Sequence, residues 1–405
     1  MPPPIEMGAD KMNPFETALQ HRLEQQKTAG RYRKRRSQRD AGVHTRINGR
    51  AMLTFCSNDY LGLATHPRVV EALCDGARQY GAGGGASHLV NGHQEIHDRL
   101  ETRLAQWTGR ERALLFGSGY QANLGVISAL MSRGGHVVHD RLNHASLLDG
   151  TRLSGARLHR FAHGDLAGAA QALAGLSPDA DRLLVSDGVF SMDGDCADVN
   201  ALARLAERHD IPLMIDDAHG LGVLGAKGAG TLEAQNVALD QVPILVGTLG
   251  KALGTQGAFV AGSHALIESL IQFARPFVYT TSLSPALAAA TLAALDIVQT
   301  EPERRAHLHH LIQRFRRELL TLALPDIALM PSETPIQPLL VGDEQAAMAL
   351  SERLYEEGIL CTAIRPPTVP PGQSRLRVTL SAAHTEADLD RLLETLERCC
   401  RTVTS

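Results

Sequence analysis

Short apolar runs alternate with amphipathic segments through the middle of the chain. The runs that read as buried strands, because they are apolar on both faces, are 113–116, 136–139, 182–188, 212–218, 243–248 and 257–262. Helical spacing of apolar residues separates several of them, as over 165–176 and 200–210. Doubly buried strands that alternate with helices predict an α/β fold with a mostly parallel sheet. In such a sheet we expect functional residues at the carboxyl ends of the strands.

The pattern changes towards both ends of the chain. The apolar residues Phe15, Leu19 and Leu23 predict a helix near the start, and the last hundred residues alternate strand and helix differently from the middle. We therefore predict three parts: an N-terminal arm with a helix over 1–55, a large α/β domain over 56–298, and a smaller C-terminal α+β domain over 299–405.

Composition narrows the class of protein. The 405 residues are 44% hydrophobic and 21% charged with a net charge of −4, which gives no overall preference for nucleic acid or membrane. No apolar run reaches the roughly 18 residues that span a bilayer, and the first residues lack the pattern of a signal peptide. The six cysteines are scattered without a CxxC pair. We expect a soluble cytoplasmic protein with free thiols and no zinc site.

A strongly basic run, 31–39, ends the arm. It has two readings: a solvated helix end, or a binding face for an anionic substrate or an acidic carrier protein. Nucleic-acid binding is not expected, because no recognisable reader module accompanies the run.

Polar residues follow several of the predicted strands. The turn Gly117–Tyr120 precedes a helix and could bind an anion, although an ordinary tight turn explains it equally well. His144 lies at a predicted helix start, and Ser191 lies in a polar loop that could be a plain surface turn. Asp216 is harder to explain, because a carboxylate that closes a buried strand needs a cation or a strong donor opposite it. We find no further His, Asp or Glu set at metal-ligand spacing.

Lys251 stands between glycines at the end of another predicted strand. A nucleotide phosphate loop would need a glycine six positions earlier and a hydroxyl residue after the lysine, where this chain has Leu245 and Ala252. A lysine in an apolar, glycine-lined place can instead act as a nucleophilic amine. With an acid, a histidine and an anion-binding turn nearby, this set of groups suits pyridoxal 5'-phosphate (PLP).

Several ordered motifs extend this reading over nearly the whole chain. "SNDYLGL" (57–63), "GGGASHLVNGH" (83–93), "DGVFSMDGD" (187–195), "DDAHGLG" (216–222), "TLGKALG" (248–254) and "YTTSLSP" (279–285) together resemble the α-oxoamine synthases, which are PLP enzymes of the class-II aminotransferase family. The resemblance implies fold type I, as in aspartate aminotransferase, and a homodimer with shared active sites. It implies small-molecule substrates and PLP as the cofactor, with no metal.

The resemblance also implies roles for particular residues. Lys251 would form the Schiff base and act as the base at the substrate Cα, Asp216 would pair with the pyridine nitrogen, and His144 would stack on the ring. His219 and Ser191 would lie near the phenolic oxygen. The expected phosphate ligands are Gly119, Tyr120 and Thr248, with Thr280 and Thr281 from a second subunit. The expected substrate ligands are Arg377 for the carboxylate, Asn58 and His144 near the amino acid, and Arg33, Arg365 and Thr368 on the acyl side. The family often has glutamate at Asp187, so we assign that position no direct substrate role.

Within the family, the segment 363–384 most resembles the members that condense L-alanine with a pimeloyl thioester in biotin biosynthesis. Two alternatives stay open: a sister synthase that uses glycine or serine with another acyl-CoA, and an aminotransferase on the same fold. The sequence also leaves open whether coenzyme A or acyl carrier protein holds the pimeloyl group.

Overall fold

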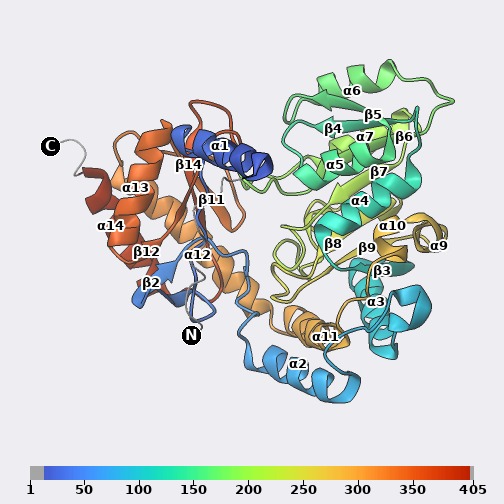
Figure 1. Cartoon of the computed structure of the whole chain (residues 1–405), viewed down its shortest axis with the longest axis horizontal. Helices are drawn as coiled ribbons and strands as arrows, with labels where there is room; N and C mark the ends of the chain where they lie inside the picture. Colours follow the sequence, from blue (N-terminus) through green and yellow to red (C-terminus); the bar gives the residue numbers. More distant parts are fainter. Residues whose placement is uncertain (1–12, 402–405) are drawn as a thin grey trace.

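The computed structural model describes residues 13–401, which form two lobes (Figure 1). One lobe holds the middle of the chain, and the other combines the C-terminal part with the strands near the N-terminus. Within residues 13–401, none of the helices combines the length and the apolar character that crossing a bilayer requires.

The larger lobe is built on a seven-stranded sheet. In spatial order its strands are β3 (Arg112–Phe116), β9 (Ala258–Gly262), β8 (Ile244–Thr248), β7 (Leu213–Asp216), β6 (Arg182–Asp187), β4 (His136–Asp140) and β5 (Arg157–Phe161). Only β9 runs antiparallel to its neighbours, so the predicted α/β fold with a mostly parallel sheet is confirmed. The edge strand β5 was not predicted, because its exposed and half-buried residues lack the apolar run of an inner strand.

Helices cover both faces of this sheet. They are α3 (Glu95–Thr108), α4 (Gly119–Leu130), α5 (Ala145–Ser154), α6 (Leu166–Ala174), α7 (Val199–Arg208), α8 (Thr231–Ala234), α9 (His264–Phe273) and α10 (Arg275–Val278), with a π-helix η1 (His88–Gly92) and a 3₁₀-helix η2 (Leu239–Gln241). Strand β6 shows how the two faces divide. Leu183 and Val185 pack into one apolar cluster with α4, whereas Leu184 packs into another with α7. This alternation is the period of a strand buried on both sides.

In two of these helices, the side chain of the residue just before the first turn fixes where the helix begins. The Ser118 hydroxyl accepts a hydrogen bond from the Gln121 N–H at 3.2 Å before α4, and the Asp198 carboxylate accepts one from the Ala201 N–H at 2.9 Å before α7. These caps satisfy N–H groups that a helix start leaves without partners. The caps therefore set where each helix begins relative to the sheet.

The smaller lobe contains two sheets. The four-stranded antiparallel sheet has the order β10 (Ala328–Leu329), β11 (Ile336–Gly342), β14 (Ser374–Thr379) and β13 (Thr362–Ile364). The three-stranded sheet has the order β1 (His44–Ile47), β2 (Arg50–Thr54) and β12 (Ile359–Leu360). Strand β12 pairs in parallel with β2, so a segment of the predicted arm completes a sheet with the C-terminal part of the chain. The predicted boundaries near 55 and 298 stay predictions.

The remaining helices frame the two lobes. They are α1 (Pro14–Thr28), α2 (Pro67–Tyr80), α11 (Pro285–Thr300), α12 (Pro302–Leu322), α13 (Glu344–Glu356) and α14 (Glu386–Arg401). One apolar cluster runs from α11 and α12 into α13 and α14, so the lobes share a continuous core. Helix α1 forms where the apolar spacing predicts it, but none of its residues is buried.

Candidate active site

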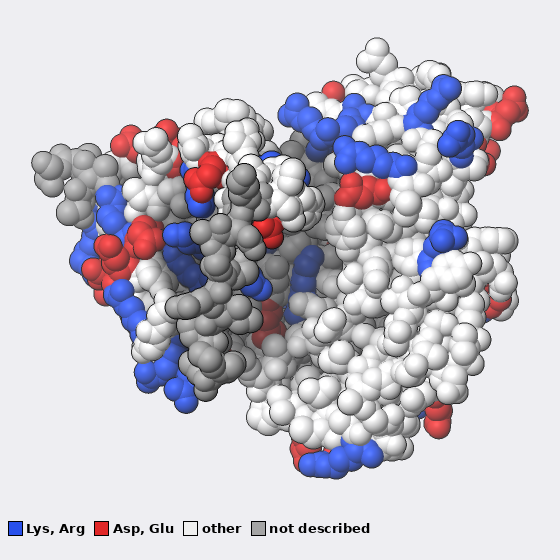
Figure 2. Space-filling view, viewed as in Figure 1, with Lys and Arg blue, Asp and Glu red and all other residues white. Residues whose placement is uncertain are grey.

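Four adjacent strands bring the predicted residues to one edge of the large sheet. Thr248, Asp216 and Asp187 are the last residues of β8, β7 and β6, and Asp187 lies directly beside Asp216 in the parallel register. His144 caps α5 just after β4. Since the carboxyl ends of parallel strands meet at one edge, the order of the strands alone places these four residues together. Figure 2 shows a hollow between the two lobes with charged side chains on its floor.

Asp216 is buried and points into the site. Its Oδ2 accepts a hydrogen bond from the Asn123 side-chain amide at 2.6 Å, and its Oδ1 accepts one from the Ala218 N–H at 3.1 Å. Neither donor is a cation. A carboxylate in this place is therefore available to a positively charged group of a ligand.

The neighbouring Asp217 anchors the loop that follows β7. Its carboxylate accepts hydrogen bonds from the Thr231 N–H at 2.7 Å and the Thr231 hydroxyl at 2.5 Å, and burial raises its pKa to about 7. A Cβ at Gly220 would lie 2.1 Å from this carboxylate, and one at Gly230 would lie 2.0 Å away. Only glycine fits such close approach, so these glycines let the loop fold tightly around Asp217 while Asp216 faces the site.

Lys251 lies three residues beyond the end of β8. Its Nζ is 2.9 Å from Nε2 of His219. Burial of the amine lowers the pKa of Lys251 to about 8, although the carboxylates of Asp216 and Asp187 act in the opposite direction. The residue as a whole keeps some exposure to solvent. A larger fraction of this amine is thus neutral and nucleophilic near neutral pH than in an ordinary exposed lysine.

A chain of hydrogen bonds continues from His219 into the smaller lobe. His219 Nδ1 lies 2.6 Å from the hydroxyl of Tyr60, and that hydroxyl is 3.2 Å from Oδ1 of Asn58. Burial lowers the pKa of His219 well below its usual value and raises that of Tyr60 to about 12. The sequence predicted His219 and Asn58 but not Tyr60, since nothing local distinguishes it from a core tyrosine.

Arg377 on β14 ends this chain. Its two terminal nitrogens lie 3.3 and 3.2 Å from Oδ1 of Asn58, and its Nε donates to the backbone carbonyl of Ser191 at 2.6 Å. The side chain of Ser191 makes no hydrogen bond to His219 among residues 13–401. Arg377 is buried, and both terminal nitrogens of its guanidinium face Asn58. A carboxylate could take the place of the Asn58 oxygen.

The loop that carries Ser191 is held by the smaller lobe. Arg375, which is almost fully buried, pairs with Asp193, and the hydroxyls of Ser332 and Thr334 each donate to the carbonyl of Gly194 at 2.9 Å. Gly194 has φ +71°, which favours glycine. The site is therefore assembled from both lobes.

His144 is fixed at both its backbone and its ring. Its N–H donates to Oδ2 of Asp187 at 3.0 Å, and its Nδ1 lies 2.7 Å from the Ser146 hydroxyl. Burial lowers the pKa of His144, so the ring is neutral near neutral pH. The second oxygen of Asp187 is buried without a hydrogen-bond partner among the described residues. The sequence assigned Asp187 no direct substrate role, and its visible contact is with the backbone of His144.

The expected phosphate ligands lie around the start of α4 and the end of β8. A Cβ at Gly119 would meet nothing within 4 Å, so open space lies over this helix start. The ring of Tyr120 is 6.3 Å from that of His144, edge to face, and its hydroxyl bonds to Asp149. The Thr248 hydroxyl accepts from the Gly250 N–H at 3.3 Å.

Other expected residues stand apart from this group. Thr281 pairs with Ser87 in an isolated bridge, and within residues 13–401 no hydrogen bond joins Thr280 or Thr281 to Lys251. On the acyl side, Arg365 bonds to Glu344 at 2.7 Å and to the Gly30 carbonyl, and its own carbonyl accepts from the Thr368 N–H at 3.0 Å. Arg33 follows Gly30 by three residues and is exposed. The basic run thus reaches the predicted acyl side without a contact to the strand-end residues.

Three histidines of "SHLVNGHQEIH" also come together. His88 Nδ1 and His93 Nδ1 lie 2.7 Å apart, and ligand atoms of both lie within 4.8 Å of one on His97. The sequence expected no metal set, and its spacing was too irregular to predict this one. Both ring nitrogens of His97 already have backbone partners, the Gln94 N–H at 3.0 Å and the Leu283 carbonyl at 2.8 Å. This cluster ties α3 to the segment before α11.

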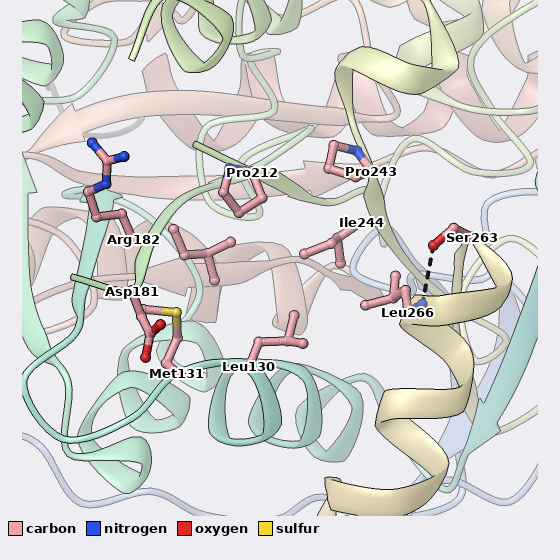
Figure 3. Close-up of a pocket in the computed structure, with 10 residues that line it drawn as sticks. Leu130, Met131, Asp181, Arg182, Pro212, Pro243, Ile244, Ser263 and Leu266 are labelled. Atoms are coloured by element: carbon pink, nitrogen blue, oxygen red, sulfur yellow. Dashed lines mark hydrogen bonds between the residues drawn. The ribbon is translucent and has the colours of Figure 1, made fainter. Parts of the chain in front are cut away.

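An apolar cavity lies at the opposite edge of the sheet. Its volume is about 350 Å³, and its walls include Leu183, Pro212 and Ile244 at the amino ends of β6, β7 and β8 (Figure 3). The carboxylate and guanidinium of Asp181 and Arg182 lie at one side of it. It is therefore separate from the strand ends that carry Asp216 and Lys251.

A family model described as aminotransferase class I and II matches residues 50–396. The chain belongs to this family. Curated relatives named 8-amino-7-oxononanoate synthase come from Thioalkalivibrio sulfidiphilus (57% identical, 95% of this chain and 97% of the relative), Pseudomonas syringae pv. syringae (56%, 94% and 95%) and Saccharophagus degradans (53%, 96% and 98%). These relatives confirm the resemblance drawn from the motifs.

Solved structures of the aminotransferase fold agree with this placement. Serine palmitoyltransferase from Sphingomonas wittichii matches with a TM-score of 0.90 and 30% identity over 97% of this chain and 99% of that one. 8-Amino-7-oxononanoate synthase from Francisella tularensis matches with a TM-score of 0.75 and 30% identity over 87% of this chain and 99% of that one. An SPT structure solved with PLP matches with a TM-score of 0.90 and 27% identity over 97% and 100%. The predicted fold type is confirmed.

Proposed function

We propose that this protein is a PLP-dependent acyltransferase that condenses L-alanine with a pimeloyl thioester. The products are 8-amino-7-oxononanoate, CO2 and the free thiol carrier, as in biotin biosynthesis. The observation that carries the proposal is that one sheet edge holds both the Lys251 amine, whose pKa is lowered to about 8, and the buried Asp216 carboxylate. The named relatives at 53–57% identity support the choice of substrates.

The residues present fit PLP. Asp216 is a buried carboxylate whose hydrogen-bond donors, the Asn123 amide and the Ala218 N–H, are uncharged, which suits a protonated pyridine nitrogen. Open space over Gly119 at the amino end of α4 suits the phosphate, because free N–H groups and the helix dipole favour an anion there. When bound, PLP supplies an aldehyde for amines and a ring that withdraws electrons from the substrate Cα. Lys251 would hold it covalently, and His144 would cover one face of its ring.

The roles proposed for the remaining residues follow from their contacts. Gly119, Tyr120 and Thr248 would bind the phosphate. His219 and Ser191 would lie near the phenolic oxygen, and His219 is already positioned by Tyr60 at 2.6 Å. Arg377 would bind the carboxylate of L-alanine through its two terminal nitrogens, which now face Asn58. Arg33, Arg365 and Thr368 would contact the pimeloyl group.

In the reaction, the chain binds, orients and moves protons. Arg377 orients the alanine carboxylate, and the Lys251 amine takes the proton from the alanine Cα. Asp216 would keep a proton on the ring nitrogen of bound PLP. The alanine Cα bonds to the pimeloyl carbonyl carbon, and the C–S bond breaks to release the carrier as a thiolate, which takes a proton from solvent. The carboxylate held by Arg377 then leaves as CO2. Lys251 returns a proton to the same carbon. A lysine whose pKa is near 8 suits a group that must both accept and donate this proton.

We also propose a homodimer with shared active sites. Within residues 13–401, Thr281 pairs with Ser87 rather than with the strand-end residues of its own subunit, which leaves Thr280 and Thr281 to be used by a second copy. The pimeloyl carrier is coenzyme A or acyl carrier protein. The basic run 31–39 suits an acidic carrier protein, although a solvated arm accounts for the same charges.

The test is turnover of L-alanine with pimeloyl-CoA, with the product identified by mass. The wild-type protein should release CO2 and coenzyme A in equal amounts. Lys251→Ala should fold normally, judged by circular dichroism, and should lack turnover and the cofactor's visible absorbance. Lys227→Ala is the matched control, since Lys227 is an exposed lysine outside the site. Normal turnover by Lys251→Ala would show that the scheme is wrong.

The same assay separates the alternatives. Glycine or serine with acetyl- or palmitoyl-CoA, used faster than alanine with pimeloyl-CoA, would indicate a sister synthase. Transfer of the amino group to a keto acid without CO2 release would indicate an aminotransferase.

A further inference from the structure

Asn123 is a polar residue inside an otherwise apolar stretch of α4. It is 1% exposed, and its neighbours Ala122, Val126 and Ile127 belong to the core between α4 and the sheet. Its amide nitrogen donates two hydrogen bonds, one to Oδ2 of Asp216 at 2.6 Å and one to the hydroxyl of Ser146 at 2.8 Å. Asn123 therefore joins β7 to the start of α5.

The orientation of the Asn123 amide follows from its partners. A carboxylate only accepts hydrogen bonds, so the amide nitrogen must face Asp216. The amide oxygen is then buried without a partner among the described residues. Leaving a buried acceptor unpaired costs roughly 1–3 kcal/mol. An apolar residue would avoid that cost. The value of an asparagine here therefore lies in the two hydrogen bonds that its nitrogen donates.

The second branch of the network sets the state of the His144 ring. The Ser146 N–H can only donate, and it lies 3.3 Å from His144 Nδ1, so Nδ1 carries the lone pair. The Ser146 hydroxyl, 2.7 Å away, must then donate to Nδ1 as well. Its oxygen is left to accept from Asn123. The neutral His144 ring accordingly carries its proton on Nε2.

We propose that Asn123 is a positioning residue of the active site. It fixes the Asp216 carboxylate directly and fixes the ring and tautomer of His144 through Ser146. The inference rests on the proposed function of Asp216 and His144 as the groups that contact PLP. One amide thus orients both residues.

Two substitutions at this position give different signatures. Asn123→Leu removes the donor at every pH, and PLP affinity should fall roughly 10- to 150-fold without a new pH dependence, the range for a hydrogen bond to a charged group. Asn123→Asp places a second carboxyl against Asp216. Two carboxyls this close share one proton, so the variant should bind PLP nearly normally at low pH. When the second proton leaves, affinity and kcat should fall together, by at most about tenfold per pH unit.

Ser146→Ala tests the second branch. It should leave the Asn123–Asp216 contact and PLP binding largely intact. In cofactor-free protein labelled with ¹⁵N-histidine, the wild-type His144 signal should show the Nε2–H tautomer. The variant keeps only the longer contact from the backbone N–H of residue 146, at 3.3 Å, and should show a larger share of the Nδ1–H tautomer. The His144→Gln protein identifies that signal by its loss.

Ser128→Ala is the matched control, because Ser128 lies on α4 and, among the residues that the structure describes, its hydroxyl bonds only to the helix carbonyls of Leu124 and Gly125. It should match the wild type in PLP affinity, pH profile and His144 tautomer. The proposal is overturned if Asn123→Asp has the wild-type pH profile, or if Asn123→Leu and Ser128→Ala lose PLP affinity equally. A wild-type protein that makes no product while these binding signatures appear would contradict the proposed reaction and leave the positioning role standing.

Discussion

Removing one oxygen atom, by Tyr60→Phe, should slow catalysis without weakening alanine binding. The Tyr60 ring is fully buried and phenylalanine keeps its packing. The lost hydroxyl lies 2.6 Å from His219 Nδ1, and His219 Nε2 lies 2.9 Å from the Lys251 amine. The substitution leaves one nitrogen of a buried imidazole without a partner, which costs roughly 1–3 kcal/mol. At about 1.4 kcal/mol per tenfold, kcat should fall roughly 5- to 150-fold.

The KM for L-alanine should change little, because Asn58 keeps its two contacts with Arg377, at 3.3 and 3.2 Å, after the tyrosine hydroxyl is gone. The assay is steady-state turnover with alanine varied and pimeloyl-CoA saturating, beside thermal unfolding of each protein. Tyr355→Phe is the control, since that ring packs under the Arg36 guanidinium and its hydroxyl forms no hydrogen bond within residues 13–401. An unchanged kcat, or a rise in KM alone, would refute the reasoning.

Three further outcomes are expected. Arg377→Lys should raise the KM for L-alanine about tenfold or more and change kcat less, because an ammonium cannot form two parallel hydrogen bonds with a carboxylate. Steady-state kinetics measure both constants, and an unchanged KM would contradict this prediction. Gly220→Ala should lower the free energy of unfolding by about 1–3 kcal/mol in urea, since its Cβ would lie 2.1 Å from the Asp217 carboxylate; equal stability would count against this packing. Burial raises the Asp217 pKa from 3.8 to about 7, so its contribution to stability is complete below pH 3.8 and is lost as pH rises through about 7. Between pH 4 and pH 8, the free energy of unfolding of Asp217→Asn should fall less than that of the wild type. Equal falls of this free energy with pH, measured by urea unfolding, would show the reasoning to be wrong.

The strands that carry the site were predictable because they are buried on both faces. The strands ending at Asp187, Asp216 and Thr248 are mostly apolar, and each ends at a polar residue. Strand β5 was not predicted, because its exposed positions hold arginine and a half-buried position holds histidine. The segment 359–364 divides between two sheets, since β12 pairs with β2 and β13 with β14. No local pattern encodes a pairing with a segment three hundred residues away.

The residues of the site also divide into those that the sequence could identify and those that it could not. Lys251, Asp216 and His144 stand at strand ends, where chain order and chemistry identify them together. Tyr60 and Asn123 look like ordinary core residues in their own segments. Their roles depend on partners 159 and 93 positions away, which only the folded chain reveals.

The contact between Asn58 and Arg377 spans 319 residues and bears on how the protein is made. Ribosomes add roughly 5–20 residues per second, so Arg377, the arginine that we propose binds the substrate carboxylate, is synthesised at least about 15 seconds after its partner. The seven-stranded sheet is complete in sequence by Gly262, more than a hundred residues earlier. A nascent chain at that stage already holds Lys251 and Asp216 but lacks Arg377. On the proposed function, turnover therefore has to await the synthesis of Arg377.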